Sequence, residues 1–301
     1  MKKRPLVFII INYNDYKTTE RLLLNIKDYK SIHHIIVVDN HSTDQSYTYL
    51  KKYESKHITV YKTKENKGFS YGMNEGAKIA LKLYKKCDLV FSNSDIILSS
   101  NENLEELQKV LSNKEIGVLG PVICQDHELS RGWKIPLPKK TIWTNLPIVG
   151  RKFSKKYTVY SEEHYKTDIS FVDAVSGCFF LIKSEVLEQV GFFDENVFLY
   201  YEENILATKL KCTNYKIAVY NKVVIIHDHA VTINKNMNMI KKFKTLKKSQ
   251  YYFEEKYNNA TKRELFLMKF AARLTLITLY IRKNIKFHFF TIFLPYLFVI
   301  V

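Results

Sequence analysis

The sequence predicts an α/β fold with a mostly parallel β-sheet that is covered by helices on both faces. Short apolar runs rich in β-branched residues alternate with segments of helical periodicity four times within about a hundred residues, as in chains of β-α-β units. Hydrophobic residues make up 46% of the 301 residues, which is enough to bury a large core and argues against wholesale disorder.

Each expected element follows from its local pattern. Continuous apolar runs that end in polar residues predict strands over 6–11, 35–38, 58–61, 89–91 and 117–123. Apolar residues three or four positions apart predict helices over 18–29, 42–53 (with Ser42 or Thr43 as its cap) and 71–85. Residues 125–167 show no clear period and are expected to form a long surface excursion. Beyond it we expect strand character over 171–183, short helices over 185–190 and 202–212, and one or two strands over 216–226.

The charge is concentrated near the carboxyl terminus. The formal net charge is +17, which indicates an acidic partner such as nucleic acid, anionic lipid or a phosphate-bearing substrate. Lys235–Lys286 contains fourteen Lys or Arg and three acidic residues. We therefore expect a main domain over 1–234 and a basic, amphipathic helical region over 235–301. The apolar run Phe287–Val301 is shorter than the roughly 20 residues that a spanning helix needs, so attachment to an anionic membrane surface is favoured over packing on the sheet or on a second subunit.

Cysteine usage and the amino terminus indicate the cytoplasm. No cysteine lies in a Cys-x-x-Cys pair, and all have apolar or strand-like flanks, as reduced and mostly buried thiols do. These cysteines are Cys87, Cys124, Cys178 and Cys212. The basic start is followed by an apolar run that breaks at Asn12 without a small-residue cleavage site, so no signal peptide is expected. We expect a cytoplasmic protein attached peripherally to the inner face of the cell membrane.

Polar side chains stand where expected strands end. Asn12 follows the first strand, Asp39 the second and Asp95 the fourth. The carboxyl ends of parallel strands share one edge of the sheet, and ligands bind beyond that edge. One such carboxylate could simply cap a helix. Together with the pair Glu202 and Glu203, however, these residues could hold a base or ribose, a divalent cation and a reacting hydroxyl.

Five segments occur in an order that is characteristic of one enzyme family. They are Val37-Val-Asp-Asn-His-Ser-Thr-Asp, Asn66-Lys-Gly-Phe-Ser-Tyr-Gly-Met-Asn-Glu-Gly, Phe91-Ser-Asn-Ser-Asp, Val175-Ser-Gly and Gly191-Phe-Phe-Asp-Glu-Asn-Val-Phe-Leu-Tyr-Tyr-Glu-Glu. Over residues 5–230 the chain resembles the family 2 glycosyltransferases, and most of all the rhamnosyltransferase-like enzymes of bacterial surface polysaccharides. The resemblance implies the GT-A fold, in which a Rossmann-like nucleotide-binding half and an acceptor-binding half share one sheet. It also implies an inverting hexosyltransferase that uses a UDP- or dTDP-sugar.

The resemblance assigns a nucleotide-binding role to five residues. Asp39 is expected to accept a hydrogen bond from the pyrimidine base, and the backbone near Asn12 is expected to line the same pocket. Asn66, Gly68 and Asn74 fall in the segment where glycine lets the backbone approach the nucleotide. A turn that leads into a helix would produce the same pattern.

The metal site is expected at Asn93-Ser-Asp95, where the family has Asp-x-Asp. Asp95 is expected to bind Mg²⁺ or Mn²⁺ on the donor's diphosphate, because hard cations prefer carboxylate oxygens. Asn93 departs from the family's Asp, so it is expected to bond to the ribose and not to the metal. His227, in the run His227-Asp-His229, is either a contact to metal or phosphate or a structural histidine.

The resemblance places Glu203 where the family has its general base, which takes the proton of the attacking hydroxyl. Glu202 precedes it as the other member of the acidic pair, and both could instead merely begin a helix. The frequent Asp two positions further on is Ile205 here. Trp133 and Trp143 could stack on a sugar, although anchoring of the loop to the core is preferred.

Three other functions remain open. A nucleotidyltransferase uses a similar sheet but usually has a Gly-rich basic loop, where this chain has Asn12-Tyr-Asn-Asp-Tyr. A non-catalytic lipid- or nucleic-acid-binding protein would explain the basic region but not the acidic residues. An inactive partner subunit is conceivable because of Asn93 and Ile205. We expect a saccharide or lipid-linked saccharide acceptor and no nucleic-acid partner, and we leave the oligomeric state open.

Overall fold

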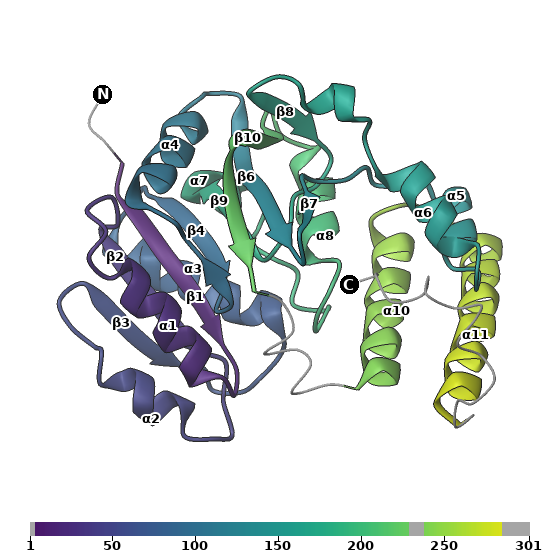
Figure 1. Ribbon diagram of the computed structural model, residues 1–301, viewed down its shortest axis with the longest axis horizontal. Coiled ribbons are helices and arrows are strands. Elements are labelled where there is room, and N and C mark those ends of the chain that lie inside the picture. Colours follow the sequence, from purple (N-terminus) through teal and green to yellow (C-terminus); the bar gives the residue numbers. More distant parts are fainter. Residues whose placement is uncertain (1–3, 229–237, 285–301) are drawn as a thin grey trace. The chain divides into compact units, whose positions relative to one another are not determined.

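The computed structural model describes residues 4–228 and 238–284 of the chain (Figure 1). The described residues form two compact units. The first combines the described parts of Met1–Trp133 and Ser161–Met237, and the second combines Lys134–Tyr160 with the described part of Asn238–Val301. The expected domains were 1–234 and 235–301. The observed division differs from them because residues 134–160 group with the carboxyl-terminal helices.

The first unit is built on a ten-stranded sheet. Its strands are β1 Leu6–Asn12, β2 His34–Asp39, β3 Ile58–Lys62, β4 Asp88–Asn93, β5 Ile96–Ile97, β6 Ile116–Gln125, β7 Glu128–Ser130, β8 Ile169–Val172, β9 Phe179–Lys183 and β10 Lys216–His227. They are ordered β3-β2-β1-β4-β9-β6-β10-β5, with β7 beside β6 and β8 beside β10. The first four strands of this order are parallel to one another, β6 and β10 are parallel, and β9 runs antiparallel between β4 and β6. The predicted fold class is confirmed.

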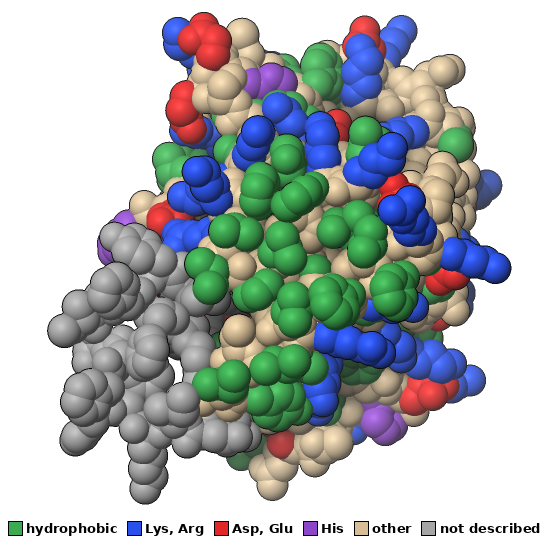
Figure 2. Space-filling view, turned by 90° about the vertical axis from the view of Figure 1, so that its right-hand side faces the viewer, with side chains coloured by type: hydrophobic (Ala, Val, Ile, Leu, Met, Phe, Trp, Pro, Cys, Tyr) green, Lys and Arg blue, Asp and Glu red, His purple; other side chains and the backbone are tan. Residues whose placement is uncertain are grey.

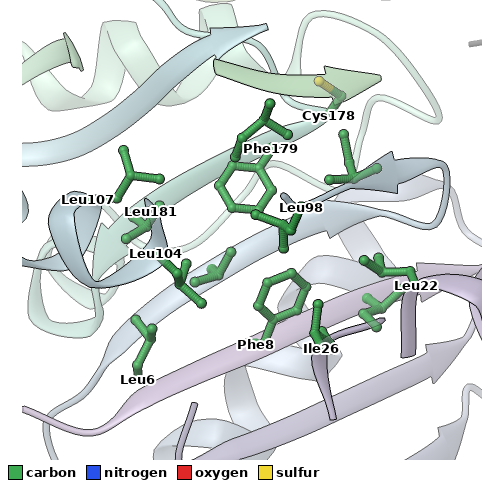
Figure 3. Packing of buried hydrophobic residues seen from close by; sticks show 14 of the residues in the cluster. Leu6, Phe8, Leu22, Ile26, Leu98, Leu104, Leu107, Cys178, Phe179 and Leu181 are labelled. Atoms are coloured by element: carbon green, nitrogen blue, oxygen red, sulfur yellow. The ribbon is translucent and has the colours of Figure 1, made fainter. Parts of the chain in front are cut away.

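Helices cover both faces of this sheet (Figure 1). They are α1 Tyr16–Ile26, α2 Ser46–Lys51, α3 Phe69–Leu83, α4 Asn101–Leu111, α7 Ser184–Gln189 and α8 Glu202–Leu210. On one face, Phe8 of β1 packs in a buried cluster with Ile26 of α1 and Leu104 of α4 (Figure 3). On the opposite face, Gly76 of α3 lies directly against Ile9 of β1. The alternation of side chains along each strand therefore supplies two hydrophobic cores.

Two local predictions in this unit need correction. The expected cap of α2 is wrong, because the hydroxyl of Ser42 accepts a hydrogen bond from the backbone N–H of Asn14. The helix begins only at Ser46, whose N–H donates to the Asp44 side chain at 2.9 Å. Helix α4 is not predicted at all, although Ser100 caps it and its leucines are spaced as on a buried helical face.

The second unit consists of helices. They are α5 Pro138–Thr144, α6 Gly150–Thr158, α10 Met239–Lys256 and α11 Lys262–Asn284. The prediction of an irregular excursion over 125–167 is therefore wrong in part, since it contains α5, α6 and the short 3₁₀ helix η1 Glu162–Tyr165. Helices of seven and nine residues are too short to establish a clear period. None of the described helices is long and apolar enough to cross a membrane, and the run Phe287–Val301 lies outside the described residues.

The contact between α3 and the sheet gives the first testable prediction. A Cβ at Gly76 would lie 2.5 Å from Cγ2 of Ile9, so Gly76→Ala requires the Ile9 side chain or the helix to shift. We expect it to lower the free energy of unfolding by about 1–2 kcal/mol in urea titrations, despite alanine's higher helix propensity. Gly72→Ala is the matched control in the same helix, because its Cβ would lie 3.3 Å from the nearest atom. Equal effects of the two substitutions would contradict this account of the packing.

Candidate active site

Asn12 and Asp39 meet at the carboxyl ends of β1 and β2, because the parallel register pairs these two residues. Nδ2 of Asn12 donates to Oδ2 of Asp39 at 2.8 Å, and Oδ1 of Asp39 accepts from the backbone N–H of Ser42 at 2.9 Å. Both residues are 0% exposed. Asp39 thus holds the strand end and the following turn together. The predicted contact with a base would require its carboxylate to become exposed.

The segment that starts at Asn66 is shaped by contacts within the protein. Oδ1 of Asn66 accepts from the N–H of Gly68 at 3.0 Å. Gly68 has a φ of +110°, and a Cβ there would overlap the backbone of Phe198. The N–H of Phe69 donates to the carbonyl of Phe198 at 2.8 Å. In this structure the glycine therefore allows close approach of Phe198, and its predicted role toward a nucleotide stays a prediction.

Asn74 connects the same segment to the loop before the acidic pair. Its Nδ2 donates to the carbonyl of Phe193 at 3.0 Å and to Oε1 of Glu195 at 2.7 Å, and its Oδ1 accepts from the N–H of Phe193 at 3.0 Å. The side chain is 2% exposed. It braces the loop, so two segments that the sequence presents as separate motifs are physically joined.

Asp95 and His227 form a pair beyond the end of β4. Oδ1 of Asp95 and Nε2 of His227 are 3.1 Å apart, and Nδ1 of His227 lies 3.1 Å from Oε1 of Gln125. Both members are more than nine-tenths buried. Asn93, the last residue of β4, is partly exposed, and its backbone N–H donates to the carbonyl of Cys178 at 2.8 Å. The structure therefore brings together Asp95 and His227, which were both considered as contacts to metal or phosphate, and it places Asn93, the residue expected at the ribose, at the end of the adjoining strand.

The charge of His227 is set by its neighbours. Burial by itself lowers the pKa of His227, but hydrogen bonds with Asp95 and Cys178 outweigh burial and raise it to about 10. The raised pKa favours a protonated imidazole in the pair with Asp95. A metal ion would have to displace this proton, because imidazole ligates through a neutral nitrogen.

The oxygen of Asp95 and the nitrogen of His227 suit a divalent cation for which the protein supplies only some of the ligands. Within the described residues there is no cluster of three or more His, Cys, Asp and Glu side chains suited to a metal. One carboxylate and one imidazole suit an ion whose remaining positions are filled by substrate oxygens and water. His229 lies outside the described part of the chain.

The acidic pair begins α8 immediately after two strained residues. Tyr200 and Tyr201 both have a φ of +71°, a left-handed conformation that is uncommon outside glycine. Glu202 is 6% exposed and lies in a small pocket that it shares with Glu203 and apolar side chains. The apolar lining is Met73, Val118, Val175, Phe180, Phe193, Leu206 and Ile217. Oε2 of Glu202 and the hydroxyl of Tyr200 find no hydrogen-bond partner among the described residues.

The two glutamates differ in exposure and in contacts. Burial, and then the charge of Glu203, raise the pKa of Glu202 well above its usual range. Burial also raises the pKa of Glu203, while the backbone N–H of Gly177, 3.0 Å from its Oε1, favours the charged form. Glu203 is only partly buried. The apolar surroundings of Glu202 and the N–H of Gly177 at Glu203 both favour the proton on Glu202 and the negative charge on Glu203.

Sequence reasoning missed the turn that joins these groups. Gly177 binds the carboxylate of Glu203, and a Cβ at this position would overlap that carboxylate. The next residue, Cys178, accepts from the backbone of Asn93 and hydrogen-bonds to His227. The Val175-Ser-Gly motif was recognised, but only the long-range contacts reveal its role.

The two tryptophans lie in different units. Nε1 of Trp133 donates to Oδ1 of Asn204 at 2.9 Å, so it anchors the first turn of α8, in line with the preferred interpretation. Trp143 belongs to the second unit, where its side chain is 49% exposed.

Comparisons with known proteins identify the family of the chain. The model of the family described as "Glycosyl transferase family 2" matches residues 7–191, which is more than half of the chain. The low-salt glycan biosynthesis hexosyltransferase Agl10 of Haloferax volcanii is 23% identical over 226 residues, which span 75% of this chain and 68% of that protein. The dTDP-rhamnosyl transferase RfbF of Shigella flexneri is 24% identical over 213 residues, which span 70% of this chain and 64% of that protein.

Two solved structures show the same fold. The mannosyltransferase PcManGT of Pyrobaculum calidifontis, in complex with GDP-Man and Mn²⁺, has a TM-score of 0.60 and 15% identity, and the match covers 94% of this chain and 76% of that one. GalNAc-T7 with UDP, GalNAc and Mn²⁺ has a TM-score of 0.58 and 13% identity, with 94% and 58% covered. The match of the family model over most of the first unit, together with this fold, establishes that the chain belongs to glycosyl transferase family 2 and is a glycosyltransferase with the GT-A fold.

Proposed function

We propose that this enzyme is an inverting hexosyltransferase of cell-surface polysaccharide synthesis. It would move one sugar from a UDP- or dTDP-sugar to a hydroxyl of a saccharide or lipid-linked saccharide. The observation that carries the proposal is the turn at Gly177 and Cys178, which contacts a carboxylate suited to act as base and a residue of the metal-binding pair. Adjacent residues thus contact the proposed base, Glu203, and a proposed ligand of the metal ion, His227.

The named relatives support the donor class. RfbF is a dTDP-rhamnosyl transferase and Agl10 a hexosyltransferase of glycan biosynthesis. The two solved structures contain a GDP-sugar or UDP with a sugar, each with Mn²⁺. These names favour a nucleoside diphosphate sugar and a divalent metal, and they leave the base of the nucleotide to experiment.

In the proposed reaction Glu203 accepts the proton of the acceptor hydroxyl. The N–H of Gly177 fixes the orientation of its carboxylate, and burial makes this carboxylate a stronger base than an exposed one. The hydroxyl attacks the anomeric carbon from the side opposite the diphosphate, so the configuration inverts. A single base on the attacking side is sufficient for one displacement step.

Asp95 and His227 would hold Mg²⁺ or Mn²⁺. When bound, the ion supplies positive charge that stabilises the departing diphosphate. Asn93, at the partly exposed end of β4, is proposed to bond to the ribose, and Asp39 to the base.

The first prediction of this section tests the enzyme and its metal pair. With Mg²⁺ or Mn²⁺, the protein is expected to release UDP or dTDP slowly from one member of a panel of nucleotide sugars. Asp95→Ala should lower this rate about 100-fold or more, because it removes the carboxylate that binds the ion. Asp28→Ala is the matched control, since the side chain of Asp28 is 83% exposed and forms an ion pair with the neighbouring Lys27. Absence of both turnover and nucleotide binding by calorimetry would refute the proposal.

A second prediction separates the two glutamates. Glu203→Gln should reduce kcat about 10²- to 10⁴-fold, because an amide cannot accept the proton, and donor binding should persist. Glu202→Gln should change kcat only a few-fold, because a protonated carboxyl and an amide have similar shape and polarity. Steady-state kinetics with donor and acceptor decide between them. The reverse order of effects would assign the base to Glu202.

A third prediction concerns stability and pH. The pKa of Glu202 is raised in the folded protein, so the unfolded chain releases this proton near pH 4.3 whereas the folded chain retains it. Its stabilising contribution is therefore complete at low pH and is lost as pH rises toward the folded pKa. From about pH 5 up to the folded pKa of Glu202, wild type should lose about 1.4 kcal/mol of unfolding free energy per pH unit relative to Glu202→Gln. Urea titrations of both proteins at several pH values measure this difference, and parallel pH profiles would show that Glu202 is not the proton carrier.

A further inference from the structure

Nearly all of the net charge belongs to the second unit. Its described residues contain nineteen Lys or Arg and three acidic residues, a net charge of +16 compared with +17 for the whole chain. Residues 134–160 carry seven basic residues and no acidic one. Of the three acids, Glu254 is 1% exposed, and burial raises its pKa to about 7. This unit therefore presents a strongly positive surface, which attracts anionic partners.

Helix α11 is apolar on two opposite sides. Leu265 and Met268 are buried within the unit, as the core side of a helix requires. Phe266, Phe270 and Ile277 recur on one side of the helix and are 65%, 52% and 54% exposed. A surface helix that faces only water is normally polar on its outer side. The outer side of α11 is therefore suited to an apolar partner.

The link between α5 and α6 continues this apolar surface. Trp143, Ile148 and Val149 are 49%, 83% and 41% exposed. Ile148 has a φ of +65°, which is uncommon for a β-branched residue and costs backbone energy. The carbonyl of Asn145 accepts from the hydroxyl of Thr275 at 2.9 Å, so the link lies against α11. Seen from that side, apolar side chains gather in one broad area with Lys and Arg at its margins (Figure 2).

We propose that this surface binds the interface of an anionic lipid bilayer. The name docking face is used here for Trp143, Ile148 and Val149 of the α5–α6 link with Phe266, Phe270 and Ile277 of α11. Exposed apolar and indole side chains bordered by basic ones suit the boundary between acyl chains and anionic headgroups. The basic side chains can lay their aliphatic stems on the apolar surface while their charges reach phosphate.

Two other partners fit the docking face less well. A second copy of the chain would bring two units of charge +16 together across a two-fold interface, with strong repulsion. A nucleic acid would satisfy the charge but would not cover exposed Phe and Ile side chains. A bilayer satisfies both the apolar and the basic part, and it would place the enzyme where a lipid-linked acceptor resides.

The test is co-sedimentation of the full chain with vesicles of phosphatidylcholine, alone or mixed with phosphatidylglycerol. Binding to the anionic vesicles should be at least about tenfold stronger than to the neutral ones and should weaken with salt. The double variant Phe266→Ser, Phe270→Ser should lose at least about tenfold in partitioning. Leu83→Ser is the matched control, because Leu83 is an apolar helix residue of the first unit with 48% exposure; it should bind like wild type.

Several outcomes would overturn the proposal. Equal binding to both kinds of vesicle would remove the electrostatic component, and wild-type binding by the double variant would place attachment elsewhere, for example in residues 285–301. A wild type that ignores vesicles but forms a dimer which the double variant dissociates, by light scattering, would make the docking face a protein interface. Donor hydrolysis in solution, measured on every variant together with circular dichroism, should be unchanged, so failure here is distinguishable from failure of the proposed function.

Discussion

The backbone of two adjacent residues, Gly177 and Cys178, determines the geometry of the candidate active site. One N–H orients the carboxylate of Glu203, and one carbonyl receives the end of β4 at Asn93. The Cys178 side chain reaches His227. The same turn contacts both groups, so the position of the Glu203 carboxylate is coupled to the position of the pair of Asp95 and His227. A side chain at 177 would displace the Glu203 carboxylate, which lies where its Cβ would be.

Several features of the site lower the stability of the folded protein. Tyr200 and Tyr201 are held in left-handed conformations, and two carboxyl groups are buried directly after them. Two adjacent negative charges in an apolar pocket would be strongly destabilising. The raised pKa of Glu202 favours retention of its proton, which would leave Glu203 as the single anion. Such an arrangement costs stability and is typical of sites whose acid–base properties are tuned for reaction.

The sequence was sufficient for features that depend on local pattern. Local pattern predicted the long strands and several helices but not the short strands β5 and β7, and the parallel sheet placed Asn12, Asp39 and Asp95 at one edge. It could not show that Gly68 accommodates Phe198, because that contact joins residues 130 positions apart in the chain. The helices in 134–160 were missed for a different reason: they are short, and their apolar residues are exposed as well as buried.

Local pattern also could not show that α11, which was expected to be amphipathic, has exposed apolar side chains as well as buried ones. Charge interleaved with Phe, Leu and Ile has a helical period, but the period alone does not say which apolar side faces the core. Packing answers this, since burial of Met268 and Leu265 leaves Phe266 and Phe270 outside. The structure also separates the two uses of charge. The residues outside the second unit are together nearly neutral, so in the proposed reaction their overall charge would not attract an anionic donor. The basic helices are then available for a different anionic partner.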